Sequence, residues 1–106
     1  MDFNRLIRTN IPDLAQVYGG ARGRTMSSRH QSYAWPALVE SGITQVIDLR
    51  KADSSEKLPL LCDKYKIEYF HYPVDNDKET IVKMVELMPE LCKRIDKGNF
   101  YIACAM

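Results

Sequence analysis

The 106-residue sequence predicts a single α/β domain with a mainly parallel central sheet flanked by helices. Strand-like and helix-like segments alternate along the chain, which is typical of parallel strands joined by helices. The strand-like runs are rich in β-branched and aromatic residues, and the helix-like runs repeat apolar residues at helical spacing. The composition, 45% hydrophobic and 27% charged, fits a globular domain.

The first part of the chain carries the weakest structural signals. Residues 1–15 are expected to form an irregular N-terminal segment, and the domain proper is expected to span 16–106. Gln16–Tyr18 could form a short strand that ends at two glycines. Residues 21–31 then form a basic loop with almost no apolar residue, which is either a solvated surface loop or an arm that attracts an anionic substrate. Its basic residues are Arg22, Arg24 and Arg29.

The middle of the chain alternates clearly between helix and strand. Val46 and Ile47 are adjacent apolar residues, which suits a strand that is buried on both faces. Leu58, Leu61 and Tyr65 recur at helical spacing. The predicted elements are a helix over Ser32–Ser41, a strand over Ile43–Leu49, a helix from Ser55 through Tyr65 and a strand over Ile67–Val74.

A long helix is predicted to begin near Lys78 or Glu79, with Pro89 expected to kink it or split it in two. Its apolar residues form one stripe that is expected to lie on the sheet. A last strand from Phe100 ends at Cys104. The stripe consists of Ile81, Met84, Met88, Leu91 and Ile95.

Several residues that could carry chemistry are expected to be structural. Asp48 closes a strand and is expected to cap the following loop, and His71 lies among aromatic residues inside a strand. Cys62 and Cys92 lie on helix faces and are expected to be buried packing residues. Three cysteines without a C-x-x-C pair indicate a reducing, cytoplasmic compartment.

The charge balance excludes some classes of partner. Fifteen basic and fourteen acidic residues give a formal charge of +1, which gives no argument for nucleic acid or for a membrane surface. No apolar run approaches the roughly 20 residues of a membrane span. The sequence also lacks a metal-ligand cluster, so neither a metal nor another cofactor is expected.

The candidate site is the end of the last strand. Open α/β sheets bind their ligands at the carboxyl ends of parallel strands, and Cys104 lies at such an end. A loop rich in backbone N–H groups would stabilise both a thiolate and an anionic substrate there. Asp75 and Asp77 follow the preceding strand, where one of them could act as a proton donor or both could simply cap the next helix.

Three stretches together resemble the cysteine-based protein tyrosine phosphatases, particularly the dual-specificity and tyrosine-phosphatase-like branch. They are GITQVIDLR (Gly42–Arg50), YPVDND (Tyr72–Asp77) and FYIACAM (Phe100–Met106), and the resemblance covers 16–106. It implies a phosphotyrosine-phosphatase-like fold that lacks the C-terminal helices, with Cys104 as the nucleophile that opens a C-x5-R loop. It also implies that Ala105 and Met106 belong to that phosphate-binding loop, whose arginine is not in this sequence.

The resemblance implies hydrolysis of phosphate monoesters through a cysteinyl-phosphate intermediate. The position that family members most often give to the acidic aspartate falls on Asn76, so the resemblance leaves two neighbours as candidates for the general acid. They are Asp77, which is slightly favoured, and Asp75. The substrate would be a phosphorylated protein or a small phosphomonoester.

The resemblance also carries expectations about the 106-residue chain itself. It is expected to be inactive without the loop arginine, and to self-associate through apolar residues of Phe100–Ala103. Two alternatives stay open. A rhodanese-type sulfurtransferase also carries a V-x-D-x-R strand and a cysteine after a strand, and a phosphate-binding or interaction module would need no turnover.

Overall fold

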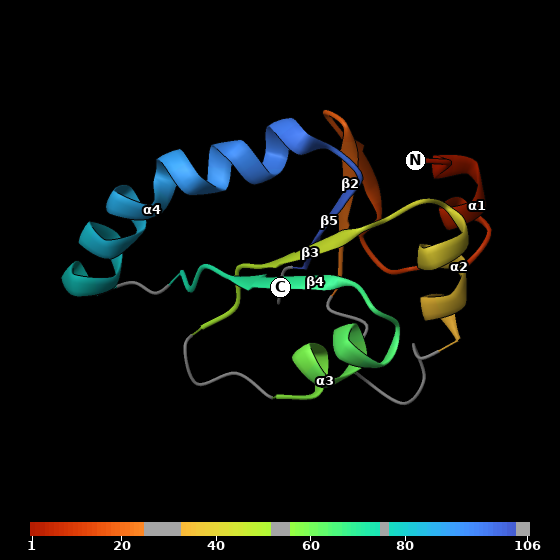
Figure 1. Ribbon diagram of the computed structural model, residues 1–106, viewed down its shortest axis with the longest axis horizontal. Coiled ribbons are helices and arrows are strands. Elements are labelled where there is room, and N and C mark those ends of the chain that lie inside the picture. The colour runs from red at the N-terminus through yellow and green to blue at the C-terminus, as the bar shows by residue number, and fades with distance from the viewer. Residues whose placement is uncertain (25–32, 52–55, 75–76, 104–106) are drawn as a thin grey trace.

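The computed structural model describes residues 1–24, 33–51, 56–74 and 77–103, and its centre is a five-stranded sheet (Figure 1). The strand order is β1-β2-β5-β3-β4. β1 and β2 form an antiparallel hairpin, and all other neighbouring strands run parallel, which confirms the predicted fold class. The strands are β1 (Ala15–Val17), β2 (Gly20–Gly23), β3 (Gln45–Asp48), β4 (Glu68–His71) and β5 (Phe100–Ala103).

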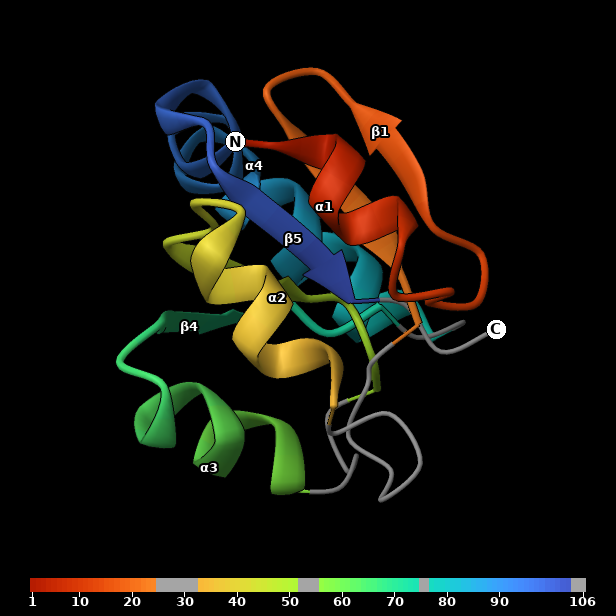
Figure 2. The ribbon, with the colours of Figure 1, turned by 90° about the vertical axis from the view of Figure 1, so that its right-hand side faces the viewer.

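Helices cover both faces of this sheet (Figures 1 and 2). Three of them, α1 (Phe3–Ile7), α2 (Ala34–Glu40) and α3 (Lys57–Lys64), share one apolar cluster with the sheet, and α4 (Lys78–Lys97) packs in a second cluster. Val46 belongs to the first cluster and Ile47 to the second. β3 is therefore buried on both faces, as its adjacent apolar residues predicted.

The prediction that residues 1–15 are irregular is wrong. α1 forms there, and its Leu6 side chain is fully buried against α2 and the sheet. The helix has only five residues, too few to produce an apolar repeat that can be recognised in the sequence.

Part of the predicted basic loop is also a strand. β2 occupies Gly20–Gly23 and pairs in parallel with β5, so that Ala21 lies beside Tyr101. A Cβ atom at Gly20 would lie 2.5 Å from the carbonyl oxygen of Phe100, so the close approach of the two strands requires glycine. Residues 25–32, which include Arg29 and Ser32, the first residue of a predicted helix, lie outside the described residues.

α4 is continuous through Pro89, so the predicted split is wrong, although Figure 1 shows that its first and last turns run in different directions. The predicted stripe is only partly buried. Met84, Leu91 and Ile95 pack toward the sheet, whereas Ile81 and Met88 are exposed. Figure 1 shows that the first turns of α4 extend beyond the sheet.

The apolar residues of β5 are not an exposed patch. Phe100, Tyr101 and Ala103 are buried, which contradicts the surface that was expected to drive self-association. Within the described residues, exposed aliphatic side chains occur on all four helices, and those on α4 include Ile81, Val82 and Val85. None of the described helices combines the length and apolar character that a membrane span needs.

Candidate active site

The carboxyl ends of β2, β5, β3 and β4 meet at one edge of the sheet. The strand register places Ala103 between Gly23 and Asp48, and Asp48 in turn beside His71. Ala103 is the residue before Cys104 in the chain. This edge is where parallel α/β sheets bind their ligands, and it is the candidate active site.

Four of the predicted site residues, Cys104, Ala105, Met106 and Asp75, lie outside the described residues. The structure therefore describes the strand that leads to Cys104 and the helix that follows the acidic loop. Of the predicted site residues, Asp77 is the one that it describes.

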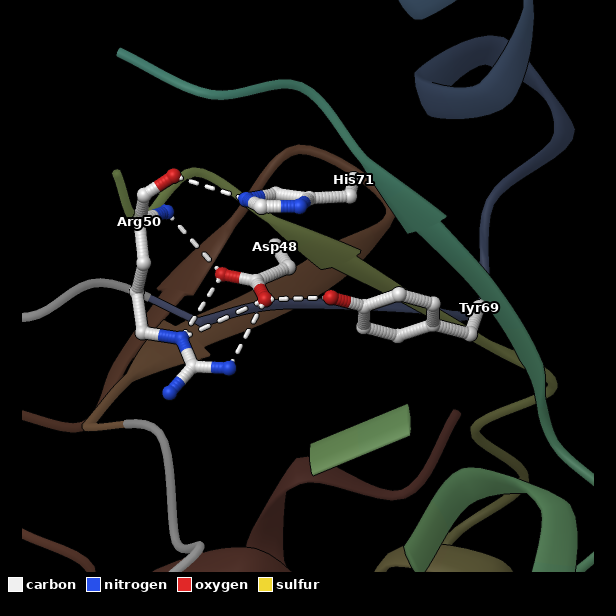
Figure 3. Close-up of polar contacts among 4 residues, drawn as sticks. All are labelled: Asp48, Arg50, Tyr69 and His71. Carbon is white, nitrogen blue, oxygen red and sulfur yellow. Dashed lines mark hydrogen bonds and ion pairs between the residues drawn. The ribbon is translucent and has the colours of Figure 1, made fainter. Parts of the chain in front are cut away.

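Asp48 and Arg50 form a buried ion pair at this edge (Figure 3). The guanidinium Nε donates to Asp48 Oδ1 at 3.0 Å and to Oδ2 at 3.2 Å, and Nη2 donates to Oδ2 at 3.0 Å. The backbone N–H of Arg50 also donates to Asp48 Oδ1 at 2.9 Å, which turns the chain tightly after β3. The side chains are 0% and 7% exposed, so water screens the pair very little.

Tyr69 provides a further hydrogen bond to the Asp48 carboxylate. Its hydroxyl donates to Asp48 Oδ2 at 2.6 Å. Burial acts to raise the pKa of Asp48, but the hydrogen bonds from Arg50 and Tyr69 outweigh burial and hold the pKa below its usual value. Burial and the bond to Asp48 both raise the pKa of Tyr69, so its hydroxyl stays protonated as a donor.

His71 links the same cluster to β4. Its Nε2 lies 2.8 Å from the carbonyl oxygen of Arg50, and its ring is tilted 44° against the Tyr69 ring with centroids 6.2 Å apart (Figure 3). The carbonyl can only accept, so Nε2 carries the proton in this contact. Both Asp48 and His71 thus have the structural roles that the sequence favoured.

This cluster, Asp48, Arg50, Tyr69 and His71, stiffens the end of β3 beside β5. The backbone N–H of Leu49 donates to the carbonyl of Ala103 at 3.1 Å, and that of Tyr72 donates to the carbonyl of Asp48 at 2.8 Å. The position of Ala103 is therefore fixed by the same residues that the ion pair holds. Sequence reasoning noted Asp48 and Arg50 but missed their pairing with Tyr69, which the alternation of side chains along β4 could have indicated.

Asp77 is the N-cap of α4. Its Oδ1 accepts from the Thr80 backbone N–H at 2.7 Å, and its Oδ2 accepts from the Thr80 hydroxyl at 2.7 Å. These hydrogen bonds lower the pKa of Asp77, so the carboxyl is ionised at neutral pH. This is the capping role that the sequence left open as the alternative to general acid.

The two described cysteines differ. Cys62 is fully buried, and burial, followed by the nearby charge of Asp48, raises the pKa of its thiol to about 12, so it is an inert packing residue as predicted. Cys92 is exposed, which contradicts its predicted burial. Among the described residues, no group of three His, Cys, Asp or Glu side chains could hold a metal ion.

Comparison with known proteins gives a fold but no family. No protein-family model and no curated protein matches the chain. A crystal structure of a "Putative phosphatase (DUF442)" from Shewanella putrefaciens CN-32 is similar, with a TM-score of 0.69 and 20% sequence identity over 97% of this chain. The fold is phosphatase-like. The chain spans 66% of the length of that structure.

A mutant form of Tk-PTP is a more distant match, with a TM-score of 0.49 and 15% identity over 86% of this chain and 59% of the other.

Proposed function

We propose that this protein hydrolyses phosphate monoesters, with Cys104 as the nucleophile. The observation that carries the proposal is the position of Cys104 in the chain directly after β5, at the carboxyl edge of a sheet with a phosphatase-like fold. The neighbouring Asp48–Arg50 pair supports it, because a reacting group needs a rigid support. Leu49, which lies between the two paired residues, donates its N–H to the carbonyl of Ala103, the residue before Cys104.

The proposed reaction has two steps. The Cys104 thiolate attacks phosphorus, a sulfur–phosphorus bond forms, and the bond from phosphorus to the ester oxygen breaks while a carboxylic acid gives that oxygen its proton. Water then attacks phosphorus, the carboxylate takes a proton from the water, and the sulfur leaves as thiolate with inorganic phosphate as the product. The backbone N–H groups of Ala105 and Met106 would stabilise the phosphate oxygens.

Asp75 and Asp77 are the two candidates for the acid. Asp77 would have to leave its bonds to Thr80 and take up a proton, which its lowered pKa opposes at neutral pH. The substitution Asp77→Asn separates the two roles, because asparagine caps a helix about as well as aspartate but cannot donate a proton as an acid. Loss of the general acid should lower the rate for poor leaving groups by about 10²–10⁴-fold.

The proposed substrate is a phosphorylated protein or a small phosphomonoester, and the proposed compartment is the reducing cytoplasm. A thiolate nucleophile has to be kept reduced to remain active.

The test is steady-state hydrolysis of phenyl phosphate by the protein expressed from its complete reading frame. Cys104→Ser should abolish turnover, whereas Cys92→Ser, a matched change at an exposed thiol on α4, should leave turnover within about twofold. Asp75→Asn and Asp77→Asn identify the acid by which of them loses activity. Turnover that survives Cys104→Ser would refute the proposal, as would transfer of sulfur from thiosulfate to cyanide in place of phosphate hydrolysis.

A further inference from the structure

A second arginine stands at the candidate edge, on the other side of β5 from Arg50. Arg24 directly follows β2, whose last residue, Gly23, lies beside Ala103 in the parallel register. Neighbouring strands are about 4.8 Å apart, so an arginine side chain that starts there can reach the region in front of β5. Arg24 plays no part in the chemistry proposed above.

The main chain of Arg24 is fixed from two sides. Its N–H donates to the carbonyl of Pro12 at 3.1 Å, and its carbonyl accepts from the Tyr101 hydroxyl at 2.5 Å. A Cβ atom at Gly23 would lie 2.5 Å from that hydroxyl, so glycine is what allows Tyr101 to reach across. Because Tyr101 belongs to β5, the strand that leads to Cys104 also positions Arg24.

The side chain of Arg24 is much more exposed than that of Arg50. Arg24 Nε donates to Asp13 Oδ2 at 2.6 Å, and each side chain is 42% exposed. In the Asp48–Arg50 pair the corresponding values are 0% and 7%. Because this position is exposed, another anion can displace the Asp13 carboxylate from Arg24, or bind beside it, at a small desolvation cost.

We propose that Arg24 is a specificity-determining residue that binds a second anionic group of the substrate, with Asp13 as the internal competitor for it. The inference rests on the proposed function, since it places that second group next to a phosphate held at the end of β5. The favoured substrates are phosphomonoesters that carry a carboxylate or a further phosphate close to the scissile one. A guanidinium suits both groups, because it can donate two parallel hydrogen bonds to either of them.

Binding measurements test the inference without depending on catalysis. Isothermal titration calorimetry compares two non-hydrolysable probes, benzylphosphonate and 3-carboxybenzylphosphonate. The wild-type protein should bind the carboxylated probe about three- to fivefold more tightly, as an exposed charge pair provides. Arg24→Gln should abolish this preference while the Kd for benzylphosphonate stays within about twofold, and Arg24→Lys should keep part of it.

Two further variants sharpen the test. Asp13→Asn should widen the preference, because it removes the competing carboxylate, whereas a purely structural ion pair would give no such gain. Arg5→Gln is the matched control. Arg5 forms a comparably exposed ion pair with Glu40 at 3.3 Å. Met1, four residues before Arg5, donates from its N-terminus to Asn99, which precedes β5 at the end opposite to the candidate site, so the preference should not change.

Equal affinities of the two probes for the wild-type protein would overturn the inference, as would a preference that survives Arg24→Gln. Failure of the proposed function has a different signature. The protein would then fail to hydrolyse phenyl phosphate, or would hydrolyse it without Cys104, while the contrast between the two phosphonates would still be measured.

Discussion

Replacing Arg50 with leucine should lower the free energy of unfolding by about 3–5 kcal/mol, because it leaves a buried carboxylate without its counter-charge. Arg50 gives Asp48 three side-chain hydrogen bonds of 3.0–3.2 Å. The Asp48 side chain is 0% exposed, so water does not replace them. Within the part of the chain that the structure describes, the Tyr69 hydroxyl and the backbone N–H of residue 50 still donate to Asp48, and neither carries a positive charge.

Urea unfolding measures this loss conveniently. Trp35, the single tryptophan, is fully buried and stacks on Tyr65 with centroids 5.7 Å apart, so its fluorescence reports unfolding. With an m-value of about 1.5 kcal/mol/M, the expected loss moves the midpoint down by roughly 2–3 M. Arg5→Leu, which breaks an exposed ion pair, should cost at most about 1 kcal/mol.

The pH dependence of the stability difference between Arg50→Leu and the wild-type protein identifies its cause. In the wild-type protein the pKa of Asp48 is lowered, so its ionisation stabilises the fold above the unfolded pKa of about 3.9, and this contribution is lost as the pH falls through the folded pKa. Without Arg50, burial should raise the pKa of Asp48 instead. The stability gap between variant and wild type should therefore narrow from pH 7 to pH 4.

A double variant provides the cross-check. Asp48→Asn combined with Arg50→Leu should be clearly more stable than Arg50→Leu alone, because the uncompensated charge is gone. If Arg50→Leu fails to fold, Arg50→Lys supplies a milder loss of the same sign. The reasoning is refuted if Arg50→Leu lowers the free energy of unfolding by less than about 1 kcal/mol, which is the cost of losing an exposed pair. It is also refuted if the stability difference between variant and wild type does not change with pH, or if the double variant is no more stable than the single one.

Three other changes test the fold. Leu91→Ala should lower the free energy of unfolding by about 2–5 kcal/mol, because Leu91 is buried between α4 and the sheet. Val85→Ala, at an exposed position of the same helix, should change it by less than about 0.5 kcal/mol, and equal losses in urea unfolding would contradict the packing of α4. Lys66→Gly should stabilise by about 0.5–1 kcal/mol, since Lys66 has a φ of 57° after α3, and a lowered Tm would argue against this backbone conformation. Gly20→Ala should lower stability by more than about 1 kcal/mol through its clash with Phe100, and an unchanged Tm would contradict the pairing of β2 with β5.

Local patterns in the sequence were enough to predict much of the architecture. Strands such as β3 and β5 are made of apolar and aromatic residues whose pattern is visible without knowledge of the partners. β2 could not be predicted in the same way, because its Gly-Ala-Arg-Gly sequence has little strand preference. It is a strand because it pairs with β1 and β5, and glycine allows the close approach to Phe100.

The misses on α4 have a geometric cause. An apolar stripe predicts that a helix packs on something, but not how far the sheet beneath it extends. The first turns of α4 project past the sheet, and of the stripe residues Ile81 and Met88 are exposed while Leu91 is buried. The position of Cys92 beside the stripe predicts burial, yet its side chain is exposed.

At the candidate site, the sequence predicted the edge but not its internal contacts. The polar residues that end β3 and the cysteine that follows β5 could be assigned to one edge, because parallel strands end together. The contacts of Asp48 with Tyr69, and of Arg24 with Asp13, join segments that are distant in sequence. Those contacts depend on register and loop path, which local patterns do not specify.

The central claim, that Cys104 is the nucleophile, is tested most directly by trapping the intermediate. The protein from the complete reading frame is mixed with phenyl phosphate, quenched in acid within the first turnover, digested and mapped by mass spectrometry. We predict a phosphoryl group on the sulfur of Cys104 that is absent from Cys62 and Cys92. It should accumulate when the variant of the acid, Asp75→Asn or Asp77→Asn, is given an activated aryl phosphate, whose leaving group needs no proton, because then only hydrolysis of the intermediate is slowed. Turnover of phenyl phosphate without any phosphorylated Cys104 would contradict the account.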